Sequence, residues 1–307
     1  MNAVARPVPP LSAAPAPAGS PDPLFIIGTG RCGSTVFHDL LAYHPDVSWF
    51  TRLVNKYPKK PRYNSMLLGL AGLPGAGSLV RKNVSPVEGY PFWEHHFHGF
   101  AAPCRDLTAD DAYPYAIASI QKMARACVTP SRPTLLLKIT GWPRLGFLHA
   151  VFPNAKFINV IRDGRAVASS LLRVGFWSGF RGPESWGWGP LSADQQARWE
   201  KYDRSFVALA GLEWEILMDA YQRAKQTVPA DRLHEIRYED LCANPIEVAR
   251  SATRFAGLQW SRELERGIAT LGLRSQNDKW KQGLSPAQQS VLSECLRQSL
   301  LRWGYKP

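Results

Sequence analysis

With 307 residues, of which 45% are hydrophobic and 11% aromatic, the chain can bury one large α/β core and has room for little more than a small cap. Its 37 Lys and Arg residues exceed its 25 Asp and Glu residues by 12, which favours anionic partners such as nucleotides, sulfated or phosphorylated ligands, nucleic acid or acidic membranes. Five widely spaced cysteines without CxxC or Cys/His metal spacing argue against a disulfide scaffold and a structural zinc site and favour a reducing, cytoplasmic setting.

The N-terminal stretch is rich in Pro and Ala and contains no apolar run long enough for a signal peptide. We interpret residues 1–23 as a disordered tail and residues 24–307 as a single domain. The longest uncharged run, 63–80, contains four glycines and Pro74, which would interrupt a membrane-spanning helix. We therefore expect no transmembrane segment, and we expect a lid or a buried hairpin of short helices in this run.

The first structured elements surround a glycine-rich stretch. The apolar run LFII at 24–27 is typical of a central parallel strand covered on both faces. It leads into GTGRCGST at 28–35 and then into VFHDLLAYH, which has an apolar helical face. Ser34 or Thr35 is expected to cap this helix, which should end at His44.

The remaining chain alternates strand-like and helix-like segments. Residues 51–133 are rich in Pro, Gly and aromatic residues and lack long periodicity, which predicts an inserted lid or acceptor-binding region of loops and short helices. The predicted strands are 47–50, 135–139, 156–161 and 233–238, and the predicted helices are 143–152, 163–173, 193–225, 244–258 and 286–302. This order predicts an α/β fold with a central parallel sheet and helices on both faces.

The stretch GTGRCGST fits two phosphate-binding templates. Gly28, Gly30 and Gly33 fit the G-x-G-x-x-G dinucleotide turn, and the same span fits a P-loop. A dinucleotide fold needs an acidic residue after the second strand, where this chain has Arg52, so NAD is disfavoured while an NADP-dependent reductase stays an alternative. Ser34 stands where a P-loop NTPase has its lysine, which argues against ATP chemistry.

A strand, a glycine loop and a helix together can also bind a tetrahedral anion. Such a loop presents backbone N–H groups, the hydroxyls of Ser34 and Thr35, and the guanidinium of Arg31. The alternative is a tight glycine turn with Arg31 in solvent.

A second signature lies in FINVIRDGRAVASSLL. Arg162 ends a predicted strand and Ser170 follows eight residues later, about two helical turns on, so both side chains can converge on a further phosphate. The alternative is that Arg162 pairs with Asp163 or Glu239 as part of the scaffold.

The two motifs together resemble the sulfotransferase family that uses 3′-phosphoadenosine 5′-phosphosulfate (PAPS), and in pattern its bacterial and tyrosylprotein-like branches. In that family the glycine loop holds the 5′-phosphosulfate, and an Arg with a Ser eight residues on holds the 3′-phosphate. The resemblance extends to HPDV, FPNAKFI, RYEDL and the closing LSPAQQ and GY. It implies a P-loop-like three-layer fold, PAPS as co-substrate and no metal.

The resemblance also implies roles for individual residues. Arg31 is the strongest catalytic candidate, and Cys32 contributes its backbone N–H. Independently of the resemblance, Lys138 stands at the end of a predicted strand near the mouth of the sheet, where a second cation could contact the transferring sulfonate, and the alternative is a surface lysine at a strand end. RSQNDKWKQ resembles the loop that clamps the 3′-phosphate. The expected nucleotide-binding residues are Gly30, Arg31, Cys32, Gly33, Ser34, Thr35, Arg162, Ser170, Tyr238 and Lys281.

A general base is expected to deprotonate the acceptor hydroxyl. Tyrosylprotein-like relatives carry a Glu after the second strand, but WFTRL at this place has no carboxylate. The nearest candidates are Glu94, which we favour narrowly, and Glu88, with His95, His96 and His98 beside them, since an imidazole could share a proton near neutral pH. The cluster has no HExxH spacing, so we predict no metal site, and a solvated aromatic loop is the alternative.

The aromatic segment at 176–190, FWSGFRGPESWGWGP, is either structural or the lining of a pocket for a sugar, an aryl group or a lipid.

The leading hypothesis is therefore a monomeric or homodimeric sulfotransferase acting on a hydroxyl of a small or medium carbohydrate, lipid or natural product. An NADP-dependent reductase would leave Arg162 and Ser170 without a role. A non-catalytic nucleotide or polyanion binder would explain the charge, but the basic residues form no cluster interleaved with aromatics, so nucleic acid is not an expected partner.

Overall fold

The computed structural model describes residues 22–70 and 84–307. Most of the predicted tail at 1–23, and the part of the predicted lid or hairpin beyond residue 70, lie outside the described residues. Five parallel strands form one sheet in the order β2-β3-β1-β4-β5. Their bounds are β1 Leu24–Gly28, β2 Val47–Trp49, β3 Thr134–Thr140, β4 Lys156–Ile161 and β5 Leu233–Arg237. The predicted α/β fold with a central parallel sheet is confirmed.

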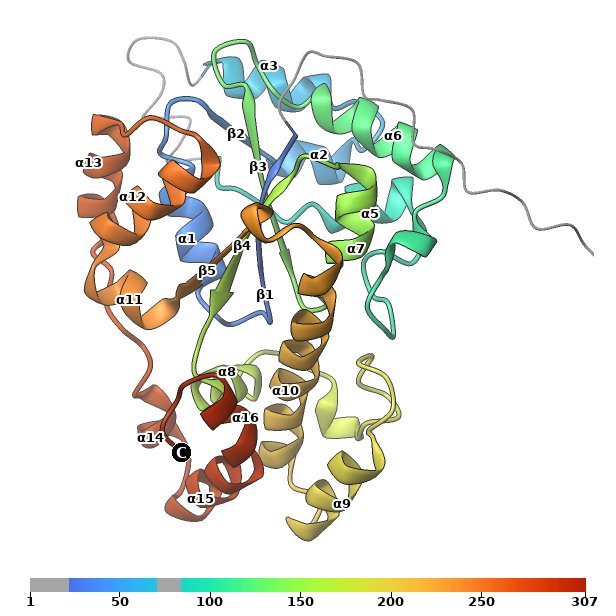
Figure 1. The fold of residues 1–307 in the computed structure, drawn as a ribbon, viewed down its shortest axis with the longest axis vertical. Helices are drawn as coiled ribbons and strands as arrows, with labels where there is room; N and C mark the ends of the chain where they lie inside the picture. The colour runs from blue at the N-terminus through green and yellow to red at the C-terminus, as the bar shows by residue number, and fades with distance from the viewer. Residues whose placement is uncertain (1–21, 71–83) are drawn as a thin grey trace, which may run out of the picture.

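Helices cover both faces of the sheet, because alternate residues of each buried strand point to opposite sides. On β1, Leu24 and Ile26 join one apolar cluster, and Phe25 and Ile27 join the other. The first face is covered by α1 (Ser34–Leu41), α11 (Tyr238–Ala243), α12 (Pro245–Ala256) and α13 (Arg262–Leu271) (Figure 1). The second is covered by α5 (Tyr90–His96), α6 (Pro114–Arg125), α7 (Leu145–Val151) and α10 (Phe206–Ala224). These layers confirm the three-layer architecture.

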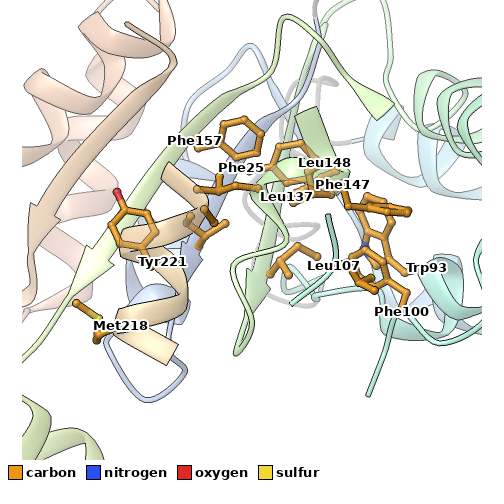
Figure 2. Packing of buried hydrophobic residues seen from close by; sticks show 14 of the residues in the cluster. Phe25, Trp93, Phe100, Leu107, Leu137, Phe147, Leu148, Phe157, Met218 and Tyr221 are labelled. Atoms are coloured by element: carbon orange, nitrogen blue, oxygen red, sulfur yellow. The ribbon is translucent and has the colours of Figure 1, made fainter. Parts of the chain in front are cut away.

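The insertion between β2 and β3 is part of the core. Its elements are α2 (Arg52–Lys56), α3 (Arg62–Leu70), α5, the 3-10 turn η1 (Ala109–Asp111) and α6. Trp93 and Phe100 from this region are fully buried, with Phe100 packed on Phe147 of α7 and Trp93 beside Phe25 of β1 (Figure 2). Residues 51–133 therefore contribute packing as well as any role at the site, and α6, with 12 residues, is longer than the predicted short helices.

Several helix boundaries differ from the predictions. The first helix ends at Leu41, and Gly33 rather than Ser34 or Thr35 is its N-cap residue. The segment 193–225 divides into α9 (Ala193–Lys201) and α10, which is followed by η3 (Lys225–Thr227). The break between α9 and α10 falls at Asp203 and Arg204, whose φ values of 52° and 54° no α-helix accommodates. The C-terminal segment divides into α15 (Pro286–Cys295) and α16 (Arg297–Arg302).

Most of the remaining elements lie around the carboxyl ends of the strands. They are α8 (Gly164–Leu171), α14 (Lys279–Gly283) and the 3-10 turn η2 (Gly179–Arg181), whereas the 3-10 turn η4 (Ala230–Arg232) lies at the amino end of β5. Helix α8 packs on α10 and α14, and this group, together with α9, α15 and α16, fills the lower part of Figure 1. None of the helices in the described parts of the chain is long and apolar enough to cross a membrane.

The strand order decides where a ligand can bind. The connection that leaves β1 leads to β2 on one side, and the connection that leaves its neighbour β4 leads to β5 on the other side, so a crevice opens between the carboxyl ends of β1 and β4. Strand β2 pairs with β3, whereas in a dinucleotide-binding fold the second strand lies beside the first. Arg52, which follows β2, is therefore one strand removed from the glycine loop, and this topology does not support the NADP alternative.

Candidate functional site

The glycine loop, residues 28–35, turns sharply between β1 and α1. Gly30, Arg31 and Gly33 have φ values of 80°, 52° and 94°, in the left-handed region that favours glycine. A Cβ atom on Gly33 would lie 2.3 Å from Cδ2 of Tyr238, so only glycine fits there. No side chain of the described residues caps α1, so the N–H groups of its first turn face the crevice without an intrahelical partner.

Cys32 is a packing residue of this loop. Its side chain is fully buried, and a Cβ atom on Gly28 would lie 2.5 Å from the Cys32 Sγ atom. Burial raises the pKa of the Cys32 thiol, which keeps it protonated and unreactive. All five cysteines are free thiols.

Arg162 lies next to the glycine loop, just past the end of β4, and is only 7% exposed. Its Nη1 atom donates to the carbonyl oxygen of Arg31 at 2.8 Å, and its Nε atom donates to Asn277 Oδ1 at 2.9 Å. The guanidinium carbon lies 4.1 Å from the centre of the Tyr238 ring. In residues 22–70 and 84–307, no carboxylate forms an ion pair with Arg162.

The two carboxylates that could have made Arg162 a scaffold residue have other partners. Asp163 pairs with Arg165 at 2.7 Å. Glu239 accepts from Asn277 Nδ2 at 2.6 Å and from the Tyr305 hydroxyl at 3.2 Å. The guanidinium of Arg162 is thus held rigidly by neutral groups, which leaves its positive charge for an anion from outside.

Arg31 connects the two signatures. Its exposed side chain donates from Nε to the Ser170 Oγ atom at 2.9 Å, while its carbonyl oxygen accepts from Arg162. The structure therefore brings together the glycine loop, Arg162 and Ser170, which are far apart in the sequence. Two guanidinium groups and one hydroxyl at this place favour a polyanionic ligand.

Lys138 points from β3 to the start of α1. It is 6% exposed, which excludes the alternative of a surface lysine. Its Nζ atom donates to Thr35 Oγ1 at 2.7 Å and lies 3.0 Å from Glu88 Oε1. The hydroxyl of Thr140, at the end of β3, donates to the same Glu88 carboxylate at 3.2 Å. A cation, a carboxylate and two hydroxyls thus meet beside the glycine loop.

Glu94, which the sequence favoured over Glu88, does not reach this network. Its carboxylate accepts from the N–H groups of Gly99 and Ala101 at 2.8 and 2.9 Å and pairs with His98 at 2.8 Å. Partial burial acts to raise the pKa of Glu94, but these N–H groups and His98 together lower it. Glu94 organises the turn after α5, whereas Glu88 lines the cavity described below.

The histidines beside Glu94 also point elsewhere. His96 is buried, with Nδ1 2.9 Å from the Ser119 hydroxyl and Nε2 3.3 Å from the Pro58 carbonyl oxygen. His95 and His98 are exposed. In the described parts of the chain, no three His, Cys, Asp or Glu residues gather as a possible metal site.

A cavity of about 500 Å³ extends from the glycine loop. The loop, Glu88 and Thr140 line one part of it, and the aromatic segment 176–190 lines another. Four aromatic lining residues, Trp142, Phe176, Trp186 and Trp188, are referred to below as the tryptophan wall, and Glu213 also lines the cavity. This volume suits a small or medium ligand.

Several lining residues were not predicted, among them Trp142, Arg144 and Glu213. Trp142 follows the end of β3, and its position directly after a predicted strand was the signal available. Arg144 is buried with a φ of 52° and donates to the carbonyl oxygens of Trp142 and Phe100 at 2.7 and 3.0 Å. Glu213 is a lone acidic residue inside the apolar run ALAGLEW of α10, and a charge at such a place was its only signal.

The predicted clamp loop reaches the site through a different residue. Lys281 has a side chain that is 59% exposed and pairs with Asp278 at 2.8 Å. Asn277 from the same loop contacts Arg162 instead. Tyr238, also predicted, packs against Gly33 and Arg162 and accepts from the Gln276 N–H at 3.1 Å.

Comparison with known proteins finds relatives over most of the chain. The family model described as "Sulfotransferase family" matches residues 23–262. The solved structure of sulfotransferase STF9 from Mycobacterium avium aligns with a TM-score of 0.58 and 18% identity over 94% of this chain and 78% of that chain. No curated protein sequence matches significantly.

Two further solved structures share the fold. Sulfotransferase STF1 from Mycobacterium tuberculosis H37Rv aligns with a TM-score of 0.53 and 17% identity over 91% of this chain and 77% of that chain. The sulfotransferase domain from the curacin biosynthetic pathway aligns with a TM-score of 0.50 and 16% identity over 94% of this chain and 99% of that chain. At these identities the likeness concerns the fold.

Proposed function

The chain belongs to the sulfotransferase family, and on this premise we propose that it transfers a sulfuryl group from PAPS to a hydroxyl group of a small or medium acceptor. The observation that carries the proposal is the contact of Lys138 with both Thr35 of the glycine loop, at 2.7 Å, and Glu88 of the cavity, at 3.0 Å. Lys138 thereby contacts both the anion-binding loop and a potential general base.

The nucleotide half of the proposal rests on fixed positive charge. The N-terminus of α1 and the glycine loop bind the 5′-phosphosulfate through backbone N–H groups, and Arg31 adds a guanidinium. Arg162 and Ser170 bind the 3′-phosphate. The absence of a carboxylate on Arg162 within the described chain supports this role, because a preformed ion pair would have to break first.

The chemical step needs three groups of this chain. Glu88 accepts the proton of the acceptor hydroxyl while the acceptor oxygen forms its bond to sulfur. Lys138 holds the sulfonate oxygens in line, and the bond between sulfur and the phosphate oxygen breaks as the new bond forms. The glycine loop N–H groups and Arg31 stabilise the negative charge that grows on the leaving phosphate oxygen.

Calorimetric titration with 3′,5′-adenosine bisphosphate, compared with NADP⁺ and ATP, tests the nucleotide class. We expect the bisphosphate to bind the wild type best and Arg162→Ala to weaken it about 30- to 100-fold, since charge-assisted hydrogen bonds are lost. Arg262→Ala is the matched control, because this exposed cation lies on α13 and does not line the cavity, and it should change the affinity by less than about twofold. Preferential binding of NADP⁺ or ATP, or no binding at all, would end the proposal.

A further inference from the structure

Glu213 is the least expected group in the cavity. It lies on α10, is 1% exposed, and accepts a hydrogen bond on Oε2 from Trp177 Nε1 at 2.7 Å. In the described parts of the chain, no Lys, Arg or His forms an ion pair with it. Glu215, two residues on and also buried, contrasts with it, since that carboxylate pairs with Arg198.

Burial without a counterion has a free-energy cost for this carboxylate. Burial raises the pKa of Glu213 to about 7, the indoles of Trp177 and Trp188 act to lower it, and no charged residue contributes. Accepting hydrogen bonds from the indoles of Trp177 and Trp188 does not require a charge, so a glutamine at position 213 would support the fold equally well. The carboxylate at the cavity is therefore suited to a partner that arrives from solvent.

The tryptophan wall gives this place a preference for positive charge. The rings of Trp142 and Trp188 lie 6.0 Å apart at 55° to each other, and aromatic faces attract cations. The indole N–H groups of Trp142 and Trp186 donate to the carbonyl oxygens of Pro103 and Gly189 at 2.9 and 2.8 Å. These bonds fix both rings in place.

The cationic side chains that line or adjoin the cavity have other partners, and Arg31, for example, donates to the Ser170 hydroxyl. Lys138 pairs with Glu88, and Arg144 donates to three carbonyl oxygens, those of Phe100, Thr140 and Trp142. Neither contributes to the pKa of Glu213. Glu213 is therefore the carboxylate of this cavity that still lacks a cation.

We propose that the acceptor is an amino alcohol whose ammonium group binds Glu213 beside the tryptophan wall while its hydroxyl group faces Glu88. The placement of the hydroxyl rests on the proposed sulfotransferase function. The ammonium site stands on the cavity alone. Both carboxylates line the same cavity of about 500 Å³, which limits the acceptor to a small or medium molecule.

The test measures binding with a matched pair of probes, 4-phenylbutylamine and 4-phenylbutan-1-ol, at pH 8 by calorimetry and tryptophan fluorescence. We expect the amine to bind the wild type at least about tenfold more tightly than the alcohol, since it adds a charge pair and cation–π contacts. Glu213→Gln should abolish this preference. Glu184→Gln removes an exposed carboxylate of the same aromatic segment and should keep it.

Any other result of these titrations would contradict one named part of the inference. Equal binding of amine and alcohol by the wild type overturns the ammonium site, even if Glu213→Gln fails to fold. Equal weakening of both probes in Glu213→Gln assigns the site to a neutral hydrogen-bond donor and also overturns it. Every titration is made with and without 3′,5′-adenosine bisphosphate. Failure of the bisphosphate to bind therefore counts against the sulfotransferase proposal, while the amine preference is still measured.

Discussion

Two adjoining regions of the site are built in opposite ways. The glycine loop with Arg162 and Ser170 comes from two short stretches, each following a central strand, and it offers backbone N–H groups and cations. The tryptophan wall with Glu213 comes from separate segments of the chain and offers ring faces and one carboxylate. The first part can fix a polyanion whatever the second part holds, so acceptor choice can change without loss of the nucleotide site.

Glu88 lies where the two parts meet, and its replacement should give the largest effect. Glu88→Gln removes the proposed general base, and we expect kcat for sulfuryl transfer to fall by about 10²- to 10⁴-fold, with bisphosphate affinity retained. Glu94→Gln is the matched control, because its carboxylate serves the turn at Gly99 and Ala101. It should lower thermal stability and leave kcat within about threefold of the wild type. A larger loss of kcat in Glu94→Gln than in Glu88→Gln would reverse the assignment.

The glycine loop can be probed by a pair of substitutions that differ in one contact. Gly30→Ala and Gly33→Ala both force alanine into a left-handed conformation, at a cost of about 1 kcal/mol. A Cβ on Gly33 would also lie 2.3 Å from the Tyr238 ring, whereas one on Gly30 would meet only Thr140 at 4.0 Å. We expect unfolding free energies lower by about 2–4 kcal/mol for Gly33→Ala and about 1 kcal/mol for Gly30→Ala. Equal costs in urea unfolding would mean that Tyr238 is free to move.

The predictable features of this molecule are local ones. The three central strands β1, β3 and β4 are mostly apolar runs of a few residues, and the glycine loop and the pair Arg162 and Ser170 each lie within one strand–loop–helix stretch. Breaks in helices were not predictable in the same way. Asp203 and Arg204 adopt positive φ values without the glycine or proline that would have indicated a break.

The choice between Glu88 and Glu94 shows why the sequence predicted the acceptor part only in outline. The two residues are six positions apart, and their directions depend on where α5 begins. Gly89, at φ 75°, begins it by packing against Phe50, which leaves Glu88 before the helix on the cavity side. Glu94 then falls on the helix and bonds to the following turn. That contact with Phe50 is long-range, as is the packing that brings Trp142, Trp186 and Glu213 together.

Stability measurements against pH should show the smallest effect and test the charge of Glu213 without any ligand. The carboxyl titrates near 4.5 when exposed and near 7 in the folded protein because of burial. Between these values the folded state binds more protons than the unfolded state, so this group makes the protein less stable as the pH rises. Glutamine stays neutral, so Glu213→Gln should be more stable relative to the wild type at pH 8 than at pH 5, by about 1–3 kcal/mol. Glu184→Gln, at an exposed position, should show no such difference. A pH-independent effect of Glu213→Gln in chemical unfolding would mean that the carboxylate is already neutralised in the free protein, which would leave no unpaired charge for an ammonium group.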